Sequence, residues 1–274
     1  MNNDRIQEIL DLMEEARLDY FLISDPQSIA YCTGYYNDPH ERMFVFMISK
    51  HGNHTLFMND LFYLDHDLDV NIVWHKDGQD AIQTIVDEMH FPGRIGIDKN
   101  WASHFLLDLM KKLPDAKYIN ASPCVDLVRM KKDLQEQVLM IESSKINDAV
   151  MEEIIPFIQE GVTEKQLAKK LDELFFNHHS TCYGAIVAFG KNAADPHHEN
   201  DDTLLRKGDC VLIDMGCVYK GYCSDMTRTF FYGGIREDEM KVYETVKKAN
   251  EAAEAMIKPG VKLSDIDKCA RKVI

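Results

Sequence analysis

Apolar residues in the first half of the chain repeat with the alternating periods of helices and strands. Ile6, Ile9 and Met13 recur at helical spacing. This spacing predicts a helix over 4–18. Short apolar runs predict strands at 20–23, 43–48, 55–58, 71–74 and 94–98, and helical spacing returns at 79–90 and 102–112. Because strands alternate with helices, residues 1–122 are predicted to form an α/β domain.

The pattern changes after residue 122, so a second domain is predicted over 123–274. Helical spacing extends over 133–160, and Thr163 is a good N-cap for the helix that follows. Further helices are predicted at 237–258 and from a cap at Ser264, and β-rich segments at 183–189, 209–217 and 222–232. The second domain therefore has a β-rich centre with helices before and after it.

A short pattern in the second domain occurs twice. The pattern is an apolar residue and an isoleucine, then two further residues, Gly-Val and a helix. It starts at Phe157 and again at Met256. The likeness fits either an internal repeat or two helix hairpins with a common turn, and in this sequence strands follow the first copy alone. The last predicted helix reaches Val273 and Ile274 without a capping residue, which indicates a chain cut within the domain.

Two β-rich runs in the segment 209–231 flank Tyr219-Lys220-Gly221, whose glycine can supply the positive φ of a tight turn. A hairpin symmetric about the Tyr219–Lys220 bond places Asp214 opposite Asp225, with Cβ atoms about 4.5–5.5 Å apart. Two ionised carboxylates in apolar surroundings repel each other unless a cation or a shared proton separates them. A bridging metal pair, a proton-sharing dyad, and a different register with both residues in water all remain open.

A tandem pair of histidines precedes this hairpin. His197 and His198 follow the β-rich run 185–189 and a polar loop. A lone histidine is more often a surface or core residue than a catalytic one. Near a metal site, however, a neutral histidine can hydrogen-bond a developing oxyanion or relay a proton. We therefore group His197 with Asp214 and Asp225 as one candidate site.

Composition and charge narrow the class of function. The chain is 45% hydrophobic and 28% charged, a balance typical of globular domains, and its net charge of -15 disfavours nucleic acid and anionic membranes as partners. No run approaches the roughly 20 apolar residues of a membrane span, and the N-terminus does not resemble a signal peptide. The seven cysteines form no C-x-x-C pair, which favours reduced thiols in the cytoplasm.

Taken together, these motifs resemble the pita-bread-fold metallopeptidases, in particular the prolidase-like Xaa-Pro dipeptidases and aminopeptidases. The matching residues of the second domain are 185–190, 192–194, 196–198, 208–209, 211–216 and 219–229. Residues 25–26 and 31–35 are similar to the N-terminal domain of prolidases and creatinases, and 129–132 to the linker between the two domains. The resemblance implies a creatinase/prolidase-like α/β domain followed by an incomplete α+β pita-bread domain.

The resemblance also implies a mechanism and its residues. Two divalent ions, most commonly Mn²⁺ but also Co²⁺ or Zn²⁺, would activate water and polarise the scissile carbonyl. Asp214 and Asp225 match two aspartate ligands, and His197 matches a histidine that steadies the tetrahedral intermediate. Tyr183 aligns with a residue of the substrate pocket, and Thr227 could hydrogen-bond a ligand carboxylate. The implied substrate is a short proline-containing peptide, and the implied assembly is a homodimer.

Part of the implied site is missing from this sequence. The family's remaining ligands, one histidine and two glutamates, lie on segments that would follow residue 274. Two carboxylates alone are too few to bind two metal ions tightly. We therefore expect the intact protein to be a peptidase, and this chain alone to be inactive or nearly so.

Two other functions share the predicted fold. A creatinase-like amidinohydrolase uses it without metal, but such an enzyme has no need of both Asp214 and Asp225. A non-catalytic pita-bread binding module would have a degenerate site. Whether a peptidase of this kind acts as a dipeptidase or an aminopeptidase is left open by the sequence.

Overall fold

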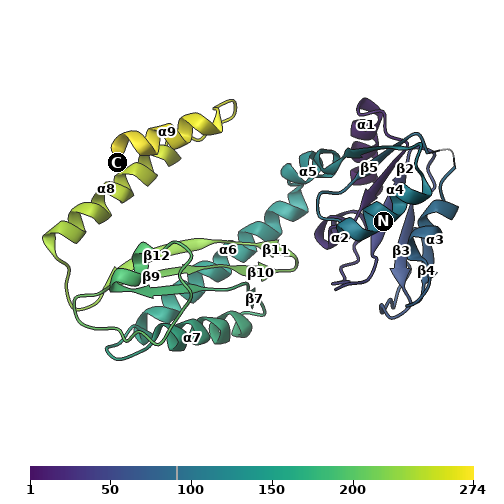
Figure 1. The fold of residues 1–274 in the computed structure, drawn as a ribbon. Helices are drawn as coiled ribbons and strands as arrows, with labels where there is room; N and C mark the ends of the chain where they lie inside the picture. The colour runs from purple at the N-terminus through teal and green to yellow at the C-terminus, as the bar shows by residue number, and fades with distance from the viewer. Residues whose placement is uncertain (91) are drawn as a thin grey trace. The chain divides into compact units, whose positions relative to one another are not determined.

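The computed structural model describes residues 1–90 and 92–274 and divides into two compact units, Met1–Lys132 and Asp133–Ile274 (Figure 1). The division lies beyond the predicted boundary at 122/123. Helix α5 (Ser122–Met130), whose residues from 123 onward were assigned from the sequence to the second domain, packs against α1 (Asn3–Glu15). Its residues Cys124, Val125 and Val128 are buried in the core of the first unit, so α5 belongs to that unit.

A six-stranded sheet in the order β4-β3-β2-β1-β5-β6 forms the centre of the first unit. β1 runs parallel to β5 and antiparallel to β2, so the sheet is mixed. The strands are β1 (Tyr20–Ile23), β2 (Val45–Ser49), β3 (Thr55–Asn59), β4 (Asn71–His75), β5 (Arg94–Ile97) and β6 (Lys117–Asn120). The predicted α/β domain is confirmed. β6 was not predicted, because its four residues include only two apolar ones, Tyr118 and Ile119.

Helices cover both faces of this sheet. Successive side chains of a strand point to opposite faces, and Phe21 and Ile23 enter a core with residues of α1, α5 and α2 (Pro26–Thr33). Tyr20 and Leu22 enter a second core that includes residues of α3 (Ala81–Asp87) and α4 (Ser103–Lys112). Because β1 is buried on both sides, its sequence reads as a continuous apolar run.

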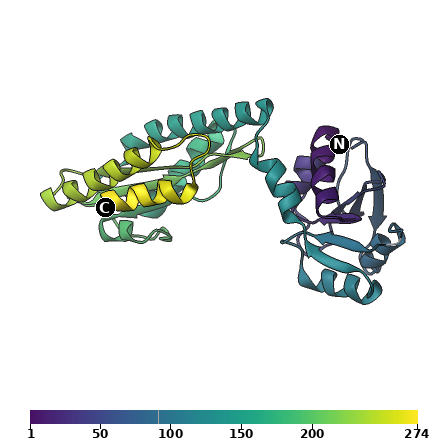
Figure 2. The same cartoon turned by 90° about the horizontal axis from the view of Figure 1, so that it is seen from above.

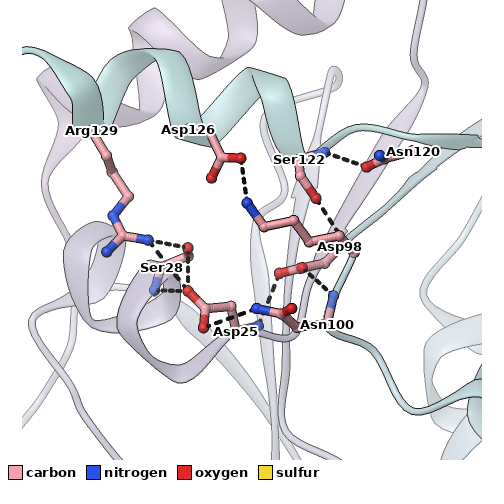
Figure 3. Close-up of polar contacts among 9 residues, drawn as sticks. Asp25, Ser28, Asp98, Asn100, Asn120, Ser122, Asp126 and Arg129 are labelled. Atoms are coloured by element: carbon pink, nitrogen blue, oxygen red, sulfur yellow. Dashed lines mark hydrogen bonds and ion pairs between the residues drawn. The ribbon is translucent and has the colours of Figure 1, made fainter. Parts of the chain in front are cut away.

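Polar residues at the carboxyl ends of β1 and β5 attach helices α2 and α5 to the sheet (Figure 3). The buried Asp98 carboxylate accepts hydrogen bonds from the N–H groups of Ser24, at 3.2 Å, and Asp25, at 2.9 Å. Asp25 in turn caps α2 through the N–H of Ser28, at 2.9 Å, and forms an ion pair with Arg129 of α5. The resemblance at residues 25–26 and 129–132 therefore falls on two segments that are in contact.

Two helices and two small sheets form the compact part of the second unit (Figure 1). The helices are α6 (Leu134–Ile154) and α7 (Glu164–Asn177). One sheet has the order β12-β9-β8 and the other β11-β10-β7. The strands are β7 (Thr181–Cys182), β8 (Ile186–Phe189), β9 (Cys210–Met215), β10 (Cys217–Tyr219), β11 (Tyr222–Cys223) and β12 (Met226–Phe231). The α+β prediction for this domain is confirmed.

Two of the three predicted β-rich segments contain breaks or more than one strand in the structure. In the segment at 183–189 the strand β8 begins only at Ile186, after Gly184, which has a φ of 109°. Gly216 separates β9 from β10, and Ser224 with Asp225 separates β11 from β12. Side chains of α6 and α7, including Val150, Leu167, Leu171 and Phe175, pack against Val187, Val211 and Ile213 of the strands.

The repeated sequence pattern corresponds to two helix hairpins. Gly161, with a φ of 84°, lies between α6 and α7, and Gly260, with a φ of 88°, lies between α8 (Glu237–Glu254) and α9 (Leu263–Val273). The α8–α9 pair lies on the other side of the sheet from α7 (Figures 1 and 2). The predicted cap Ser264 lies inside the first turn of α9, after the N-cap Lys262. None of the described helices is long and apolar enough to cross a membrane.

Candidate metal centre

The turn of the candidate hairpin is formed by Lys220 and Gly221. Both have positive φ, 48° and 84°, and the flanking Tyr219 and Tyr222 are paired across the strands. Two central residues with positive φ are the signature of a two-residue hairpin turn whose twist matches that of the strands. The predicted symmetry about the Tyr219–Lys220 bond is therefore wrong, and the hairpin is symmetric about the Lys220–Gly221 bond. The prediction placed positive φ at Gly221 only, whereas Lys220 is also left-handed.

This shift changes which residues lie opposite the aspartates. Asp214 of β9 is paired with Thr227 of β12, and Met215 with Met226. Asp225 precedes β12 and lies outside the regular ladder. The predicted cross-strand pair of Asp214 and Asp225 is thus corrected to Asp214 and Thr227.

Asp214 lies on the less buried face of β9. Its neighbours Ile213 and Met215 are buried in the core, and Asp214 alternates with them and is half-buried. The hydroxyl of Thr227 donates a hydrogen bond of 2.6 Å to Oδ1 of Asp214. This is the contact expected of Thr227, and it fixes one carboxylate oxygen of Asp214.

Asp225 is oriented by Tyr183. The tyrosine hydroxyl lies 2.6 Å from the carbonyl oxygen of Ser224 and 3.2 Å from Oδ2 of Asp225. Burial and then the negative charge of Asp225 raise the pKa of Tyr183 to about 12, and Asp214 contributes in the same direction. Tyr183 is therefore a neutral hydrogen-bond donor near neutral pH, within electrostatic reach of both aspartates.

Gly216 makes room for this tyrosine. A Cβ atom at this position would overlap the hydroxyl of Tyr183 and the carbonyl of Ser224. Helix α6 contacts the chain at the break between β11 and β12, because the hydroxyl groups of the buried Ser143 of α6 and Ser224 lie 2.9 Å apart. Asp225 therefore follows a residue that is held rigidly in the core.

The two carboxylates have the chemistry of a divalent-metal site. Among the described residues, Thr227 donates to one oxygen of Asp214, and Tyr183 shares its single hydroxyl proton between the Ser224 carbonyl, at 2.6 Å, and one oxygen of Asp225, at 3.2 Å. The second oxygen of each aspartate has no donor within the described part of the chain. Carboxylate oxygens are the ligands preferred by Mg²⁺, Ca²⁺ and Mn²⁺. Asp214 and Asp225 could therefore hold a cation, with Thr227 and Tyr183 as the groups that orient them.

His197 lies in the loop that follows β8. Its N–H donates a 3.0 Å hydrogen bond to Oδ1 of Asp195, and its side chain is exposed. Asn200 attaches the same loop to the edge of β8, accepting from the N–H of Val187 and donating to the carbonyl of Ala185, both at 2.7 Å. Because Ile186, between these two, pairs with Asp214, the loop runs beside the strand next to Asp214.

A second cluster of potential ligands was missed by the sequence analysis. Glu164, His198 and Asp201 each place one ligand-type atom within 4.8 Å of the others. Glu164 begins α7, directly after the cap Thr163, and acidic residues are common in the first turn of any helix. The complete burial of this glutamate could therefore not be predicted from its position in the sequence.

Comparison with known proteins decides the family. The model of metallopeptidase family M24 matches residues 138–274, and that of the creatinase/prolidase N-terminal domain matches residues 5–131. The chain belongs to metallopeptidase family M24. The predicted pita-bread fold and its N-terminal domain are thereby confirmed.

Several relatives with solved structures share this M24 fold. A dipeptidase from Pyrococcus horikoshii is 32% identical with a TM-score of 0.88, and the alignment covers 98% of this chain and 77% of that protein. A prolidase from Thermococcus sibiricus is 27% identical with a TM-score of 0.91, covering 100% and 77%. An uncharacterized peptidase from Staphylococcus saprophyticus is 29% identical over 280 residues, covering 98% and 78%.

Proposed function

We propose that the intact protein hydrolyses the peptide bond before proline in Xaa-Pro dipeptides or short peptides, and that it requires a divalent metal. Asp214 and Asp225 are the metal ligands of this proposal, and His197 is its catalytic residue. Membership of family M24 and the similarity to a dipeptidase and a prolidase support a small peptide as the substrate.

One observation carries the proposal. Asp214 receives a hydroxyl hydrogen bond from Thr227 on one carboxylate oxygen, and one carboxylate oxygen of Asp225 lies 3.2 Å from the Tyr183 hydroxyl, which also contacts the Ser224 carbonyl. A donor behind a metal ligand fixes the orientation of that ligand. Both carboxylates also raise the pKa of Tyr183, and two negatively charged groups around one side chain support a shared metal site.

The protein groups around such a centre have distinct tasks. A divalent cation held there, Mn²⁺ in our proposal and alternatively Co²⁺ or Zn²⁺, supplies a nucleophilic water near neutral pH and polarises a carbonyl. His197 is exposed and can donate a hydrogen bond to the oxygen that gains negative charge. Tyr183 is 47% exposed, and its ring can contact the substrate beside Asp225.

Assembly as a homodimer in the cytoplasm is part of the same proposal. The scattered, unpaired cysteines support the location. The resemblance to prolidase-like enzymes supports the dimer. Sedimentation of the intact protein would test this assembly separately from its activity.

Hydrolysis of matched dipeptides tests the proposed activity. The intact protein, supplied with Mn²⁺, should cleave an Xaa-Pro dipeptide much faster than the Xaa-Ala dipeptide with the same first residue, and a chelator should abolish cleavage. His197→Ala should lower turnover by about 10² to 10⁴-fold while the bound metal is unchanged. Equal rates on both dipeptides would refute proline specificity, and loss of metal from the His197 variant would make His197 a ligand.

A further inference from the structure

The carboxylate of Glu164 is completely buried at the start of α7. Its Oε1 accepts hydrogen bonds from the N–H of Phe189, at 2.8 Å, and from the side-chain amide of Asn192, at 2.9 Å. Its Oε2 lies 2.6 Å from Nε2 of His198 and accepts from the N–H of Asp201 at 3.1 Å. A buried carboxylate is stable only when it is hydrogen-bonded in this way.

These four partners belong to a single loop, residues 189–201. Phe189 and Asn192 lie at its beginning, where β8 ends, and His198 and Asp201 lie at its end. The N–H of Lys165 donates to the carbonyl of Asp201, so the first turn of α7 also holds the loop through its backbone. One side chain thus closes both ends of the loop.

His197 lies inside the segment that Glu164 closes. It directly precedes His198, whose ring nitrogen contacts Glu164, and its own N–H is bonded to Asp195 within the loop. Among the described residues, the His197 side chain itself has no hydrogen-bond partner. Its position is therefore set by its backbone, and the backbone is set by the contacts of the loop with Glu164.

Hydrogen bonds account for the Glu164 cluster better than a metal does. Both Glu164 oxygens already accept hydrogen bonds from backbone or side-chain amide N–H groups. These protons point at the oxygen lone pairs that a cation would need. Hydrogen bonds from Thr203 hold the pKa of Asp201 below its ordinary value, so this neighbour is also engaged with protein donors. The cluster is a hydrogen-bonded joint between α7 and the loop.

We propose that Glu164 is a positioning residue for His197. This inference rests on the function proposed above, in which His197 is the catalytic group. Glu164 acts on the reaction through the conformation of residues 189–201, without contact with substrate or metal. Displacing a catalytic group by about 1 Å can cost on the order of 10²-fold in rate, so the effect of losing Glu164 is measurable.

Hydrogen exchange of the loop gives a test that needs no activity. In Glu164→Gln, an NH2 group replaces one of the two acceptor oxygens and faces the donors of the loop, which weakens the hydrogen bonds that hold the loop. The backbone amides of Phe189 and Asp201 should therefore exchange roughly tenfold faster or more. The amides of Val211 and Ile213 in β9 should keep their protection. Glu173→Gln, an exposed position on the same helix, is the matched control and should change neither set. Unchanged loop exchange would overturn the proposal, as would an equal loss of protection in β9.

A kinetic double-mutant cycle on the intact protein tests the link to His197. Glu164→Gln should lower kcat about 10 to 100-fold with little change in KM, and the same substitution in the His197→Ala background should change kcat by less than about twofold. Independent effects of the two substitutions would overturn the proposal. If His197→Ala alone leaves turnover unchanged, the proposed function fails instead, and the exchange experiment still decides whether Glu164 orders the loop.

A milder substitution serves if Glu164→Gln does not fold. Asn192→Ala removes one donor from Oε1 and leaves the other three contacts of the carboxylate. It should produce the same changes at a smaller magnitude. The amide of Phe189 should exchange faster, the amides of β9 should keep their protection, and the decrease in kcat should disappear in the His197→Ala background. Normal exchange and normal kcat in Asn192→Ala would count against the proposal.

Discussion

The Thr227 hydroxyl donates a 2.6 Å hydrogen bond to Oδ1 of Asp214 across the β9–β12 pair. The contact exists because the hairpin turns on Lys220 and Gly221, which places Thr227 and not Asp225 opposite Asp214. The two aspartates are therefore offset along the hairpin, and each lies beside a hydroxyl group, Asp214 beside that of Thr227 and Asp225 beside that of Tyr183. This arrangement turns one oxygen of each carboxylate to the protein and leaves the other for a ligand.

Loss of the Thr227 hydroxyl should weaken metal binding without unfolding the sheet. Thr227→Val keeps the size and β-branching of the side chain but removes the donor to Asp214. Because groups behind a metal ligand typically contribute about 10 to 100-fold to affinity, Mn²⁺ binding by the intact protein should weaken by about that factor. Calorimetric titration with Mn²⁺ measures the change.

Thr229→Val is the control for this substitution. Thr229 lies two positions further along the same strand and pairs with Leu212, away from the aspartates. Its Mn²⁺ affinity should equal that of the unmodified protein. Equal affinities for the Thr227 and Thr229 variants would show that the Thr227 hydroxyl does not support a ligand.

The two-residue turn can be tested through Lys220. Its φ of 48° lies in the left-handed region, which asparagine tolerates well and β-branched residues tolerate poorly. Lys220→Asn should raise the free energy of unfolding of the second unit by about 0.5 kcal/mol, and Lys220→Val should lower it by about 1 kcal/mol. Urea denaturation measures both. The opposite order would contradict the left-handed conformation of Lys220.

Thiol reactivity should separate the cysteines by burial. All seven are free in the structure, Cys223 is exposed, and Cys32 is completely buried. Burial raises the pKa of Cys32 to about 12, so its reactive thiolate is suppressed. A disulfide reagent at about pH 8 should show a fast phase that Cys223→Ser removes, with Cys32 unreactive until the protein unfolds. Rapid modification of Cys32 in the folded protein would contradict its burial.

The same raised pKa has a consequence for stability at high pH. An unfolded thiol titrates near pH 8.5, below the folded value of about 12. The folded state therefore holds the proton of Cys32 more tightly. Its contribution to stability is complete below about pH 8.5 and is lost as the pH rises toward the folded pKa. Cys32→Ala should reduce the slope of unfolding free energy against pH above that point.

Much of the fold could be predicted because its signals are local. The apolar run at 20–23 and the cap at Thr163 both mark elements that the structure contains, β1 and α7. Helix α2 was missed because its eight residues are too few to show a period. Helix α5 was assigned to the wrong unit because its packing partner, α1, lies more than one hundred residues earlier in the sequence.

The candidate site was harder to predict, since it depends on register and on distant contacts. The Asp-containing hairpin was found, but one residue with an unusual φ, Lys220, moved the pairing of Asp214. The contact of Tyr183 with Asp225 spans 42 positions and needs the gap above Gly216. Nothing in the sequence around Glu164 reports that its carboxylate holds the loop of His197.

Binding of Mn²⁺ to aspartate variants of the intact protein tests the central claim most directly. The electron paramagnetic resonance signal of free Mn²⁺ counts bound metal without relying on activity. Asp214→Asn and Asp225→Asn should each weaken binding by more than about tenfold, whereas Asp202→Asn, an exposed carboxylate paired with Lys165, should not. Equal binding by the unmodified protein and both site variants would contradict the assignment of Asp214 and Asp225 as metal ligands.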